Sequence, residues 1–405
     1  MATKIPIGLI EATRLTRAGR LLEATALIQR ILGHSPAAAE GADLHASDRG
    51  GGAGSDVIDV EFSHVAEPAN RGPAPLQRAA GEHISQRFGV NGILRGRRDR
   101  DCVADVPRSQ ATAVEGQPGQ FVTGFYANQA GARPYKLYIP PSYAGQPLPL
   151  VVMLHGCAQT PDDFADGTRM NSLAEERQCL VLYPEQTHAA NHSRCWNWFK
   201  RGDQRRDQGE PAILAGMTRE VMNRYLVDPA RVYVAGLSAG GAMAAIMGAA
   251  YPELYAAVGV HSGLACGSAH DLPSALAAMR GMPASMAGRN PDSAPRAPAT
   301  PTIVFHGDRD KTVHPRNGEQ VISQSVEQNG ASSTDASTER GHAPGGHAYT
   351  RTVHRDPTGR VVLEHWLVHE GGHAWFGGNP RGSYSDPKGP DAAREMMRFF
   401  YENSI

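Results

Sequence analysis

The sequence predicts an α/β fold in which a mostly parallel sheet is covered by helices on both faces. Two observations predict this fold class. From about residue 120 to the end, short apolar runs of strand length alternate with longer segments of helical periodicity. The runs PLVVMLHG and PTIVFHGD stay apolar up to their last residues, as expected of strands that are buried on both faces of a parallel sheet.

The predicted elements follow in a regular order. Residues 121–140 predict two strands around a turn that contains glycine. The elements expected after them are strand 149–156, helix 164–178, strand 179–186, helix 211–226, strand 231–237, strand 256–263, strand 301–308, strand 361–370 and helix 391–404. Residues 268–300 are rich in Ala, Pro, Met and Ser and indicate an insertion. We therefore assign residues 118–405 to one α/β domain.

The first 117 residues differ in character from this domain. Residues 1–33 predict an amphipathic helical segment, with leucines near helical spacing and arginines largely on the other side. Such a helix packs on the main domain or on a partner; the alternative is a helix that rests on a lipid or polymer surface. Residues 34–117 are rich in Gly, Ala, Ser and Asp and lack periodicity, which predicts a low-complexity, mostly disordered linker.

Composition argues against several classes of partner and cofactor. The formal net charge is −1 at pH 7, which gives no reason to expect a nucleic-acid partner. No apolar run is long enough for a transmembrane segment. The five cysteines contain no CxxC pair, so we do not expect a zinc site. The N-terminus lacks the pattern of a secretory signal, which favours a cytoplasmic location.

One serine stands in a glycine-rich turn between a predicted strand and a predicted helix. In VYVAGLSAGGAMAA, residues 232–245, Ser238 is the centre of a G-x-S-x-G motif. In that context the motif indicates a nucleophile elbow, which projects the serine hydroxyl into a cleft. The residues two positions to either side must be small, because strand and helix approach closely. The alternative is a tight turn without a chemical role, but the strand-turn-helix context favours a nucleophile.

A nucleophilic serine needs a base and a group that orients the base. In this architecture they follow the serine in the order Asp or Glu, then His. The strand PTIVFHGD ends in a loop that holds Asp308 and Asp310, and we select Asp310 because Asp308 fits a turn-forming position. The strand VVLEHWLVHE precedes His373, which we select over His369 because two glycines allow it to turn back toward Ser238.

The oxyanion produced by attack on an ester needs two N–H donors. We expect them to be the amides of Ala239, directly after the nucleophile, and Cys157, in the loop after PLVVMLHG. His155 is expected to order that loop and not to act in catalysis. Cys195 lies in another loop of the same rim. Whether it forms a disulfide with Cys157 stays open, because a chain without an export signal is expected in a reducing compartment.

Aromatic residues gather in two of the loops near this predicted site, namely Trp196, Trp198 and Phe199 in one and Trp375 in the other. Any single aromatic residue is more often part of a core. Four of them near two site loops nevertheless predict that at least one lines an apolar substrate cleft. We take Trp198 and Trp375 as the candidates for substrate binding.

Together, the motifs resemble a known family. LHGCAQT, NSLAEE, YPEQ, CWNWF, GLSAGGAMA, HGDRDKTV and GGHAWFGG occur in this order. They are similar to those of the poly(3-hydroxybutyrate) depolymerase-type esterases, which are α/β-hydrolases and neighbour the feruloyl and acetylxylan esterases. The resemblance covers roughly residues 118–404. It implies the α/β-hydrolase fold, a triad of Ser238, Asp310 and His373, and Cys157 at the oxyanion loop, without metal or cofactor.

The resemblance further implies hydrolysis of short 3-hydroxyalkanoate polyesters or oligomers through an acyl-enzyme at Ser238. Secreted members of the family usually carry a signal peptide and a polymer-binding domain, and an extracellular location is the alternative that the family suggests. Because the sequence shows neither feature, we expect oligomers or a polymer granule as substrate, with the helix of residues 1–33 as a granule contact. The alternatives are a feruloyl or acetylxylan esterase and a non-catalytic granule- or surface-binding protein.

Overall fold

The structure, a computed structural model, describes residues 119–282, 299–329 and 336–405. These residues belong to the compact unit Asp99–Ile405. The predicted N-terminal helix (residues 1–33) and the predicted linker (residues 34–117) lie outside the described residues. So do residues 283–298 of the predicted insertion.

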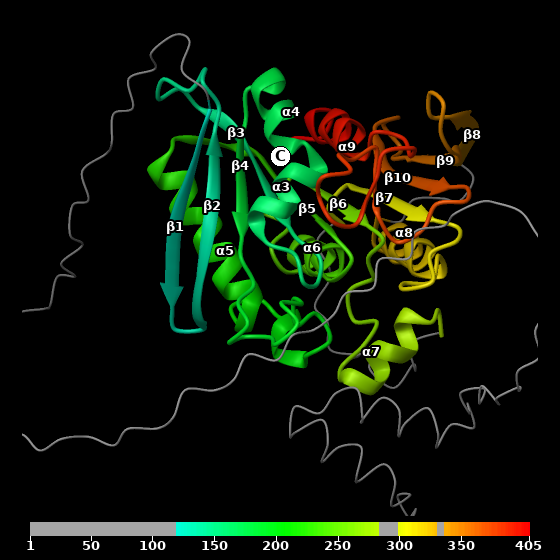
Figure 1. Cartoon of the computed structure of the whole chain (residues 1–405), viewed down its shortest axis with the longest axis horizontal. Helices are drawn as coiled ribbons and strands as arrows, with labels where there is room; N and C mark the ends of the chain where they lie inside the picture. Colours follow the sequence, from blue (N-terminus) through cyan, green and yellow to red (C-terminus); the bar gives the residue numbers. More distant parts are fainter. Residues whose placement is uncertain (1–118, 283–298, 330–335) are drawn as a thin grey trace, which may run out of the picture. The chain divides into compact units, whose positions relative to one another are not determined.

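In the described part of the chain, ten strands form one sheet in the order β1-β2-β4-β3-β5-β6-β7-β10-β9-β8 (Figure 1). The strands are β1 (Gln120–Asn128), β2 (Gly131–Ile139), β3 (Leu148–Leu154), β4 (Leu180–Pro184), β5 (Val227–Leu237), β6 (Ala257–His261), β7 (Thr302–Gly307), β8 (Ala336–His342), β9 (Ala348–Arg355) and β10 (Val361–Val368). Neighbours from β4 to β10 pair in parallel, whereas the pairs at both edges of the sheet are antiparallel. This confirms the mostly parallel sheet predicted from the sequence.

Helices cover both faces of the sheet (Figure 1). They are α3 (Pro161–Thr168), α4 (Met170–Arg177), the short 3₁₀ helix η1 (Arg201–Gln204), α5 (Gly209–Arg224), α6 (Ala239–Ala250), α7 (Leu272–Met279), α8 (Arg316–Asn329) and α9 (Ala392–Tyr401). The apolar side chains of α5, α6 and α8 share one core cluster with the sheet, and those of α3, α4 and α9 share the other. Within the ranges described, no helix combines the length and apolar content needed to cross a membrane.

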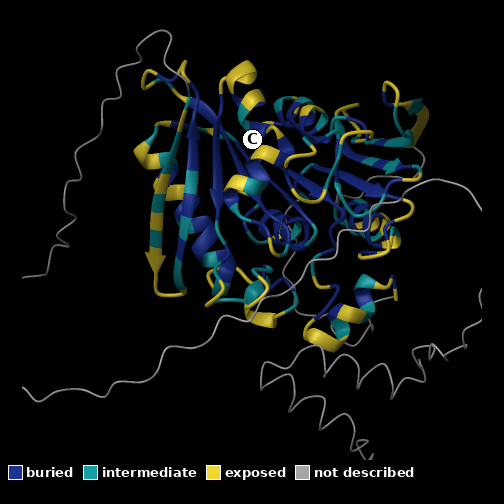
Figure 2. Cartoon of the chain, in the orientation of Figure 1, coloured by how far each residue is buried: buried dark blue, intermediate teal, exposed yellow. Residues whose placement is uncertain are grey.

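The central strands have an apolar core on each face, which explains their unbroken apolar sequence. All seven residues of β3 are buried. Leu150 and Val152 join the core cluster under α5 and α6, whereas Val151 and Met153 join the cluster under α3, α4 and α9. Successive side chains of a strand point to opposite faces, so burial on both faces requires apolar residues at every position. Figure 2 shows the buried strands between the two helical layers.

The structure contains elements that were not predicted, among them α7 and α8, and it differs most from the prediction in one helix and at one edge of the sheet. The single helix predicted over residues 164–178 is broken into α3 and α4 at Arg169, which has a φ of 56°. This left-handed residue is held by its guanidinium group, which donates to Gly377 O at 2.7 Å and to Asp391 at 2.8 Å. In addition, β8 and β9 extend the sheet at one edge. They were not predicted because β8 is almost entirely exposed and lacks an apolar pattern.

Two short strands complete the described part of the chain. They are β11 (Trp375–Phe376) and β12 (Ser385–Asp386), which form a separate parallel pair. This pair follows β10 and encloses residues 377–384, and His373 lies two residues before β11. The pairing of β11 with β12 therefore fixes both ends of the loop of residues 377–384, which contains no other helix or strand.

Candidate active site

Ser238 occupies a strained turn between β5 and α6. Its backbone has φ 57° and ψ −117°, a conformation that residues other than glycine rarely adopt. Its N–H donates to the carbonyl of His261 at 2.9 Å, at the end of the neighbouring strand β6. The side chain is half-buried, and its hydroxyl makes no hydrogen bond to another described residue. The turn thus presents a free hydroxyl at the carboxyl edge of the parallel strands, where α/β sites form.

The glycines of the motif are required by the close approach of β5, α6 and β3. A Cβ atom on Gly236 would lie 2.4 Å from the carbonyl carbon of Gly240. A Cβ atom on Gly240 would lie 2.0 Å from Leu154 O and 2.6 Å from His155 O. These are backbone atoms of a packed sheet and cannot give way as a flexible side chain does. The prediction that small residues must flank Ser238 is confirmed.

Two neighbouring carboxylates and two neighbouring histidines sort into separate pairs. Asp310 Oδ2 accepts from His373 Nδ1 at 2.7 Å, and both side chains are largely shielded from solvent. Asp308 Oδ2 instead pairs with His369 Nδ1 at 3.0 Å, and each of these side chains is about one-third exposed. The structure therefore brings together the Asp and His that the sequence analysis selected. It places the rejected Asp and His in a second, more exposed pair.

Asp310 is held as a carboxylate by donors on both of its oxygens. Its Oδ1 accepts the backbone N–H groups of Thr312 and Val313, each at 2.8 Å. Burial alone would raise the pKa of this carboxyl. Hydrogen bonds from His306, His373 and the Val313 N–H, together with the charge of His373, outweigh burial and lower the pKa below its ordinary value. A buried carboxylate of this kind fixes the Nδ1–H tautomer of His373 and leaves Nε2 free to accept a proton.

His261 connects the serine turn to the segment that follows His373. Its carbonyl accepts the Ser238 N–H, and its Nε2 accepts the Phe376 N–H at 3.0 Å. It is fully buried at the end of β6, between β5 and β7, and burial lowers its pKa well below the ordinary value. The structure does not join the Ser238 hydroxyl to His373 by a hydrogen bond. Such bonds are often longer when no substrate is bound.

The loop after β3 supplies an unpaired amide beside the serine turn. In the described structure, neither the Cys157 N–H nor the Ala239 N–H donates to a protein acceptor. The Gly156–Cys157 peptide is held by its carbonyl, which accepts from His155 Nδ1 at 2.7 Å and from the Gln159 N–H at 3.3 Å. A trans peptide points its N–H away from its C=O, so these two bonds also set the direction of the Cys157 N–H.

His155 has one defined tautomer. Its Nε2 lies 3.1 Å from the backbone N–H of Gln186, which is a donor, so Nε2 accepts and Nδ1 carries the proton. Burial lowers the pKa of His155 to about 4, and the ring is therefore neutral near pH 7. The expectation that His155 orders this loop agrees with these contacts.

A disulfide joins Cys157 to Cys195, which answers the question that the sequence left open. The Cys195 loop is anchored by Glu210, which is buried at the start of α5. Glu210 accepts from the Asn197 N–H at 2.7 Å, from the Asn197 side chain at 2.7 Å and from Arg133 at 3.2 Å. Sequence reasoning missed Glu210, because no motif connects it to Arg133 of β2 or to Asn197 of the preceding loop.

Trp198 and Trp375 do not form an open wall. Their exposed fractions are only 6% and 1%. Trp375 packs edge-on against Phe164 of α3 and stacks on His261 at 4.9 Å between ring centroids. This differs from the expected arrangement, because elements distant in sequence cover the indole ring. A substrate-binding role for either tryptophan remains a prediction, and it requires an access that the side chains lack here.

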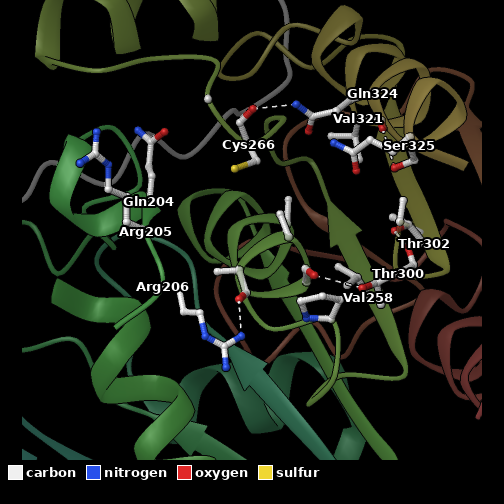
Figure 3. Close-up of a pocket in the computed structure, with 18 of the residues that line it drawn as sticks. Gln204, Arg205, Arg206, Val258, Cys266, Thr300, Thr302, Val321, Gln324 and Ser325 are labelled. Carbon is white, nitrogen blue, oxygen red and sulfur yellow. Dashed lines mark hydrogen bonds between the residues drawn. The ribbon is translucent and has the colours of Figure 1, made fainter. Parts of the chain in front are cut away.

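A pocket of ≈ 740 Å³ opens away from these residues, between α6, α8 and the loop after β6 (Figure 3). Gln324 of α8 donates to Cys266 O at 2.9 Å, and the Thr300 hydroxyl donates to Gly248 O at 3.0 Å (Figure 3). Ser238, Asp310 and His373 are absent from its described walls. We therefore assign the candidate active site to the carboxyl edge of β3, β5 and β7 and not to this pocket.

A mostly parallel sheet with a serine elbow after β5 and helices on both faces is the α/β-hydrolase fold. Residues 133–344, just over half of the chain, match the model of the family described as "Esterase PHB depolymerase". The chain belongs to this family.

The relatives agree with that assignment. Poly(3-hydroxyalkanoate) depolymerase C of Paucimonas lemoignei is 31% identical over 261 residues, which cover 62% of this chain and 60% of the relative. A probable acetylxylan esterase A of Neosartorya fischeri is 28% identical over 220 residues, which cover 51% of this chain and 58% of the relative. The chain thus spans somewhat more than half the length of these relatives. The solved structure of the acetyl xylan esterase from Aspergillus awamori is similar to this chain with a TM-score of 0.55 at 21% identity. The match covers 71% of this chain and 100% of that structure.

Proposed function

We propose that this protein is a serine esterase that hydrolyses short 3-hydroxyalkanoate polyesters or oligomers. The observation that carries the proposal is the buried pair of Asp310 and His373 at the sheet edge that also presents Ser238, whose backbone is strained and whose hydroxyl makes no hydrogen bond to a described residue. The family, and a relative named as a poly(3-hydroxyalkanoate) depolymerase, support this substrate class. The reaction needs only side chains and backbone amides, so we propose no metal or cofactor.

The first half of the proposed reaction forms the acyl-enzyme. Ser238 Oγ attacks the ester carbonyl carbon while His373 Nε2 accepts the hydroxyl proton, and Asp310 stabilises the imidazolium that results. The carbonyl oxygen becomes an oxyanion, which accepts the N–H groups of Cys157 and Ala239. When the intermediate collapses, the ester C–O bond breaks and His373 gives its proton to the departing alcohol oxygen.

The second half releases the acid. Water takes the place of the alcohol and attacks the acyl carbon while its proton passes to His373. The same two amides stabilise the second oxyanion. Collapse returns the proton to Ser238 Oγ, and the products are one carboxylic acid and the regenerated serine. Each half-reaction uses His373 once as a base and once as an acid.

The test compares wild type, Ser238→Ala, His373→Gln and the matched control His369→Gln on four esters. These are a 3-hydroxybutyrate trimer, an acetylated xylo-oligosaccharide, methyl ferulate and p-nitrophenyl butyrate. We expect turnover of the trimer and a loss of kcat of at least about 10³-fold in the first two variants. His369→Gln should stay within about threefold of wild type, because that histidine belongs to the exposed pair with Asp308.

Other outcomes would change the proposal in defined ways. Turnover of the xylan or feruloyl ester alone would keep the proposed triad and favour the second candidate, an acetylxylan or feruloyl esterase, for which the fungal relative is the supporting observation. Turnover that survives in Ser238→Ala would contradict the proposed nucleophile. If wild type hydrolyses none of the four esters, a non-catalytic granule- or surface-binding protein becomes the better account.

A contact with a polymer granule through residues 1–33 is part of the same proposal. It is supported only by the amphipathic pattern of that segment. Co-sedimentation of the full chain with poly(3-hydroxybutyrate) granules, compared with Leu22→Asp, tests it. Equal sedimentation of both proteins would refute it.

A further inference from the structure

Tyr384 is an exposed aromatic residue beside His373. Its exposed fraction is 50%, in contrast to the buried tryptophans of the neighbouring loops. The ring centroids of Tyr384 and His373 lie 6.4 Å apart, and the two planes meet at 77°, an edge-on arrangement. An aromatic face of this kind next to the proposed base is open to a bound molecule.

The backbone of Tyr384 is held in an unfavourable conformation. Its φ is 52°, in the left-handed region that a tyrosine rarely adopts. The carbonyl of Tyr384 accepts the Trp375 N–H at 2.6 Å, and the next residue, Ser385, pairs with Trp375 in the parallel pair β11 and β12. The N–H of Ser383, the preceding residue, donates to Asp163 at 2.8 Å. The chain is therefore fixed on both sides of Tyr384, and strain retained at such a position suggests a function for its side chain.

The same segment is tied to the oxyanion loop. Gln159, which is 2% exposed, donates from Nε2 to Ser383 O at 3.0 Å and accepts the Gly156 N–H with Oε1 at 2.9 Å. The buried side chain of Gln159 thus links Ser383, directly before Tyr384, to Gly156, directly before Cys157. The ring of Tyr384 thus contacts His373, and its neighbour Ser383 contacts Gln159 of the proposed oxyanion loop.

We propose that Tyr384 contacts the alcohol part of the ester and favours substrates whose alcohol part is apolar. This inference rests on the proposed function. His373 gives its proton to the departing alcohol oxygen, so the alcohol part of the substrate leaves on the side of the imidazole. Tyr384 is an exposed aromatic residue beside that imidazole. In a 3-hydroxyalkanoate oligomer, the alcohol part is the next hydroxyalkanoate unit, whose hydrocarbon backbone and side group pack on an aromatic face.

The experiment varies the alcohol and keeps the acyl group constant. Butyrate esters of methanol, benzyl alcohol and 3-hydroxybutyrate are compared in wild type, Tyr384→Gly and Tyr384→Phe. Glycine adopts a positive φ without strain, so Tyr384→Gly removes the ring and should not lower the melting temperature. We expect Tyr384→Gly to raise KM about 3- to 10-fold for the two larger alcohols and to leave methyl butyrate unchanged. Tyr384→Phe should behave like wild type.

A second measurement separates substrate contact from a structural role. All three esters form the same butyryl-enzyme, from which the alcohol has already left. The deacylation rate, measured by burst kinetics with p-nitrophenyl butyrate, should therefore be equal in wild type and Tyr384→Gly. A KM that rises equally for all three alcohols, or a slower deacylation, would overturn the inference. The proposed function fails separately, if Ser238→Ala keeps its activity.

Discussion

His155 offers a sharp test of how the proposed oxyanion site is built. Its Nδ1–H donates to Gly156 O at 2.7 Å, and this bond orients the peptide whose N–H belongs to Cys157. We compare His155→Leu, which removes the donor, with His155→Asn, whose amide nitrogen occupies nearly the position of Nδ1. Neither variant reaches the Gln186 N–H, which His155 Nε2 accepts at 3.1 Å. The difference between the two variants therefore isolates the bond to Gly156 O.

The magnitudes follow from these contacts. In both variants the buried Gln186 N–H loses its acceptor, which destabilises the fold by about 1–3 kcal/mol. In His155→Leu, Gly156 O keeps only the longer bond from the Gln159 N–H at 3.3 Å, so a further ~1 kcal/mol is lost. Removal of one oxyanion donor lowers kcat by about 10²- to 10³-fold. In His155→Leu the Cys157 N–H is still present but misaligned, so the loss of kcat should be smaller than for a removed donor. We expect kcat to be about 10- to 100-fold lower than in wild type.

Steady-state kinetics on p-nitrophenyl butyrate and urea unfolding provide the assay. KM should change little, because the bond acts on the transition state and not on ground-state binding. His155→Asn should keep a kcat within about fivefold of wild type, although it shares the lost Gln186 contact. If the two variants lose kcat equally, the Nδ1 bond does not orient the Cys157 N–H, and the reasoning is refuted.

Two further predictions concern stability. Glu364 is fully buried and accepts from Arg351 at 2.8 Å and from Arg398 at 2.7 Å; these partners outweigh burial, the largest effect, and lower its pKa. The stabilisation by the ionised Glu364 is therefore present above the unfolded pKa near 4.5 and is lost as pH falls through the folded pKa. Glu364→Gln should lower the free energy of unfolding by about 3 kcal/mol at pH 7 and by less in acid. A difference in urea unfolding that does not depend on pH would contradict this. Reduction of the Cys157–Cys195 disulfide, which spans 38 residues, should lower the free energy of unfolding by about 2–4 kcal/mol in urea titrations with a phosphine reductant. The double variant Cys157→Ser/Cys195→Ser should be insensitive to the reductant, and an equal shift in that variant would exclude the disulfide as the cause.

Local sequence patterns were sufficient to predict the serine turn and the pairing of Asp310 with His373. Gly236 and Gly240 indicated a close approach of strand and helix, and the structure shows backbone atoms that leave no room for a Cβ atom. The choice of Asp310 and His373 depended on their places after predicted strands, and the structure pairs those two at 2.7 Å. Such predictions succeed because a parallel sheet brings its strand ends to one edge whatever the details of packing.

Partners that are distant in the sequence could not be predicted in this way. Glu210, which anchors the loop of Cys195, is paired with Arg133, 77 residues away, and no motif connects these two positions. The break of the predicted helix at Arg169 likewise depends on acceptors more than 200 residues away.

The sequence by itself determined the fold class and the sheet edge at which Ser238, Asp310 and His373 lie, because both follow from the order of apolar strands and the turns between them. Only the tertiary structure decided which aromatic side chains are accessible. Trp198 and Trp375 were the candidates from sequence, yet both are buried, whereas Tyr384 is left 50% exposed. His261 and Phe164 cover the ring of Trp375. Exposure depends on which elements pack over a side chain, and those elements come from distant parts of the chain.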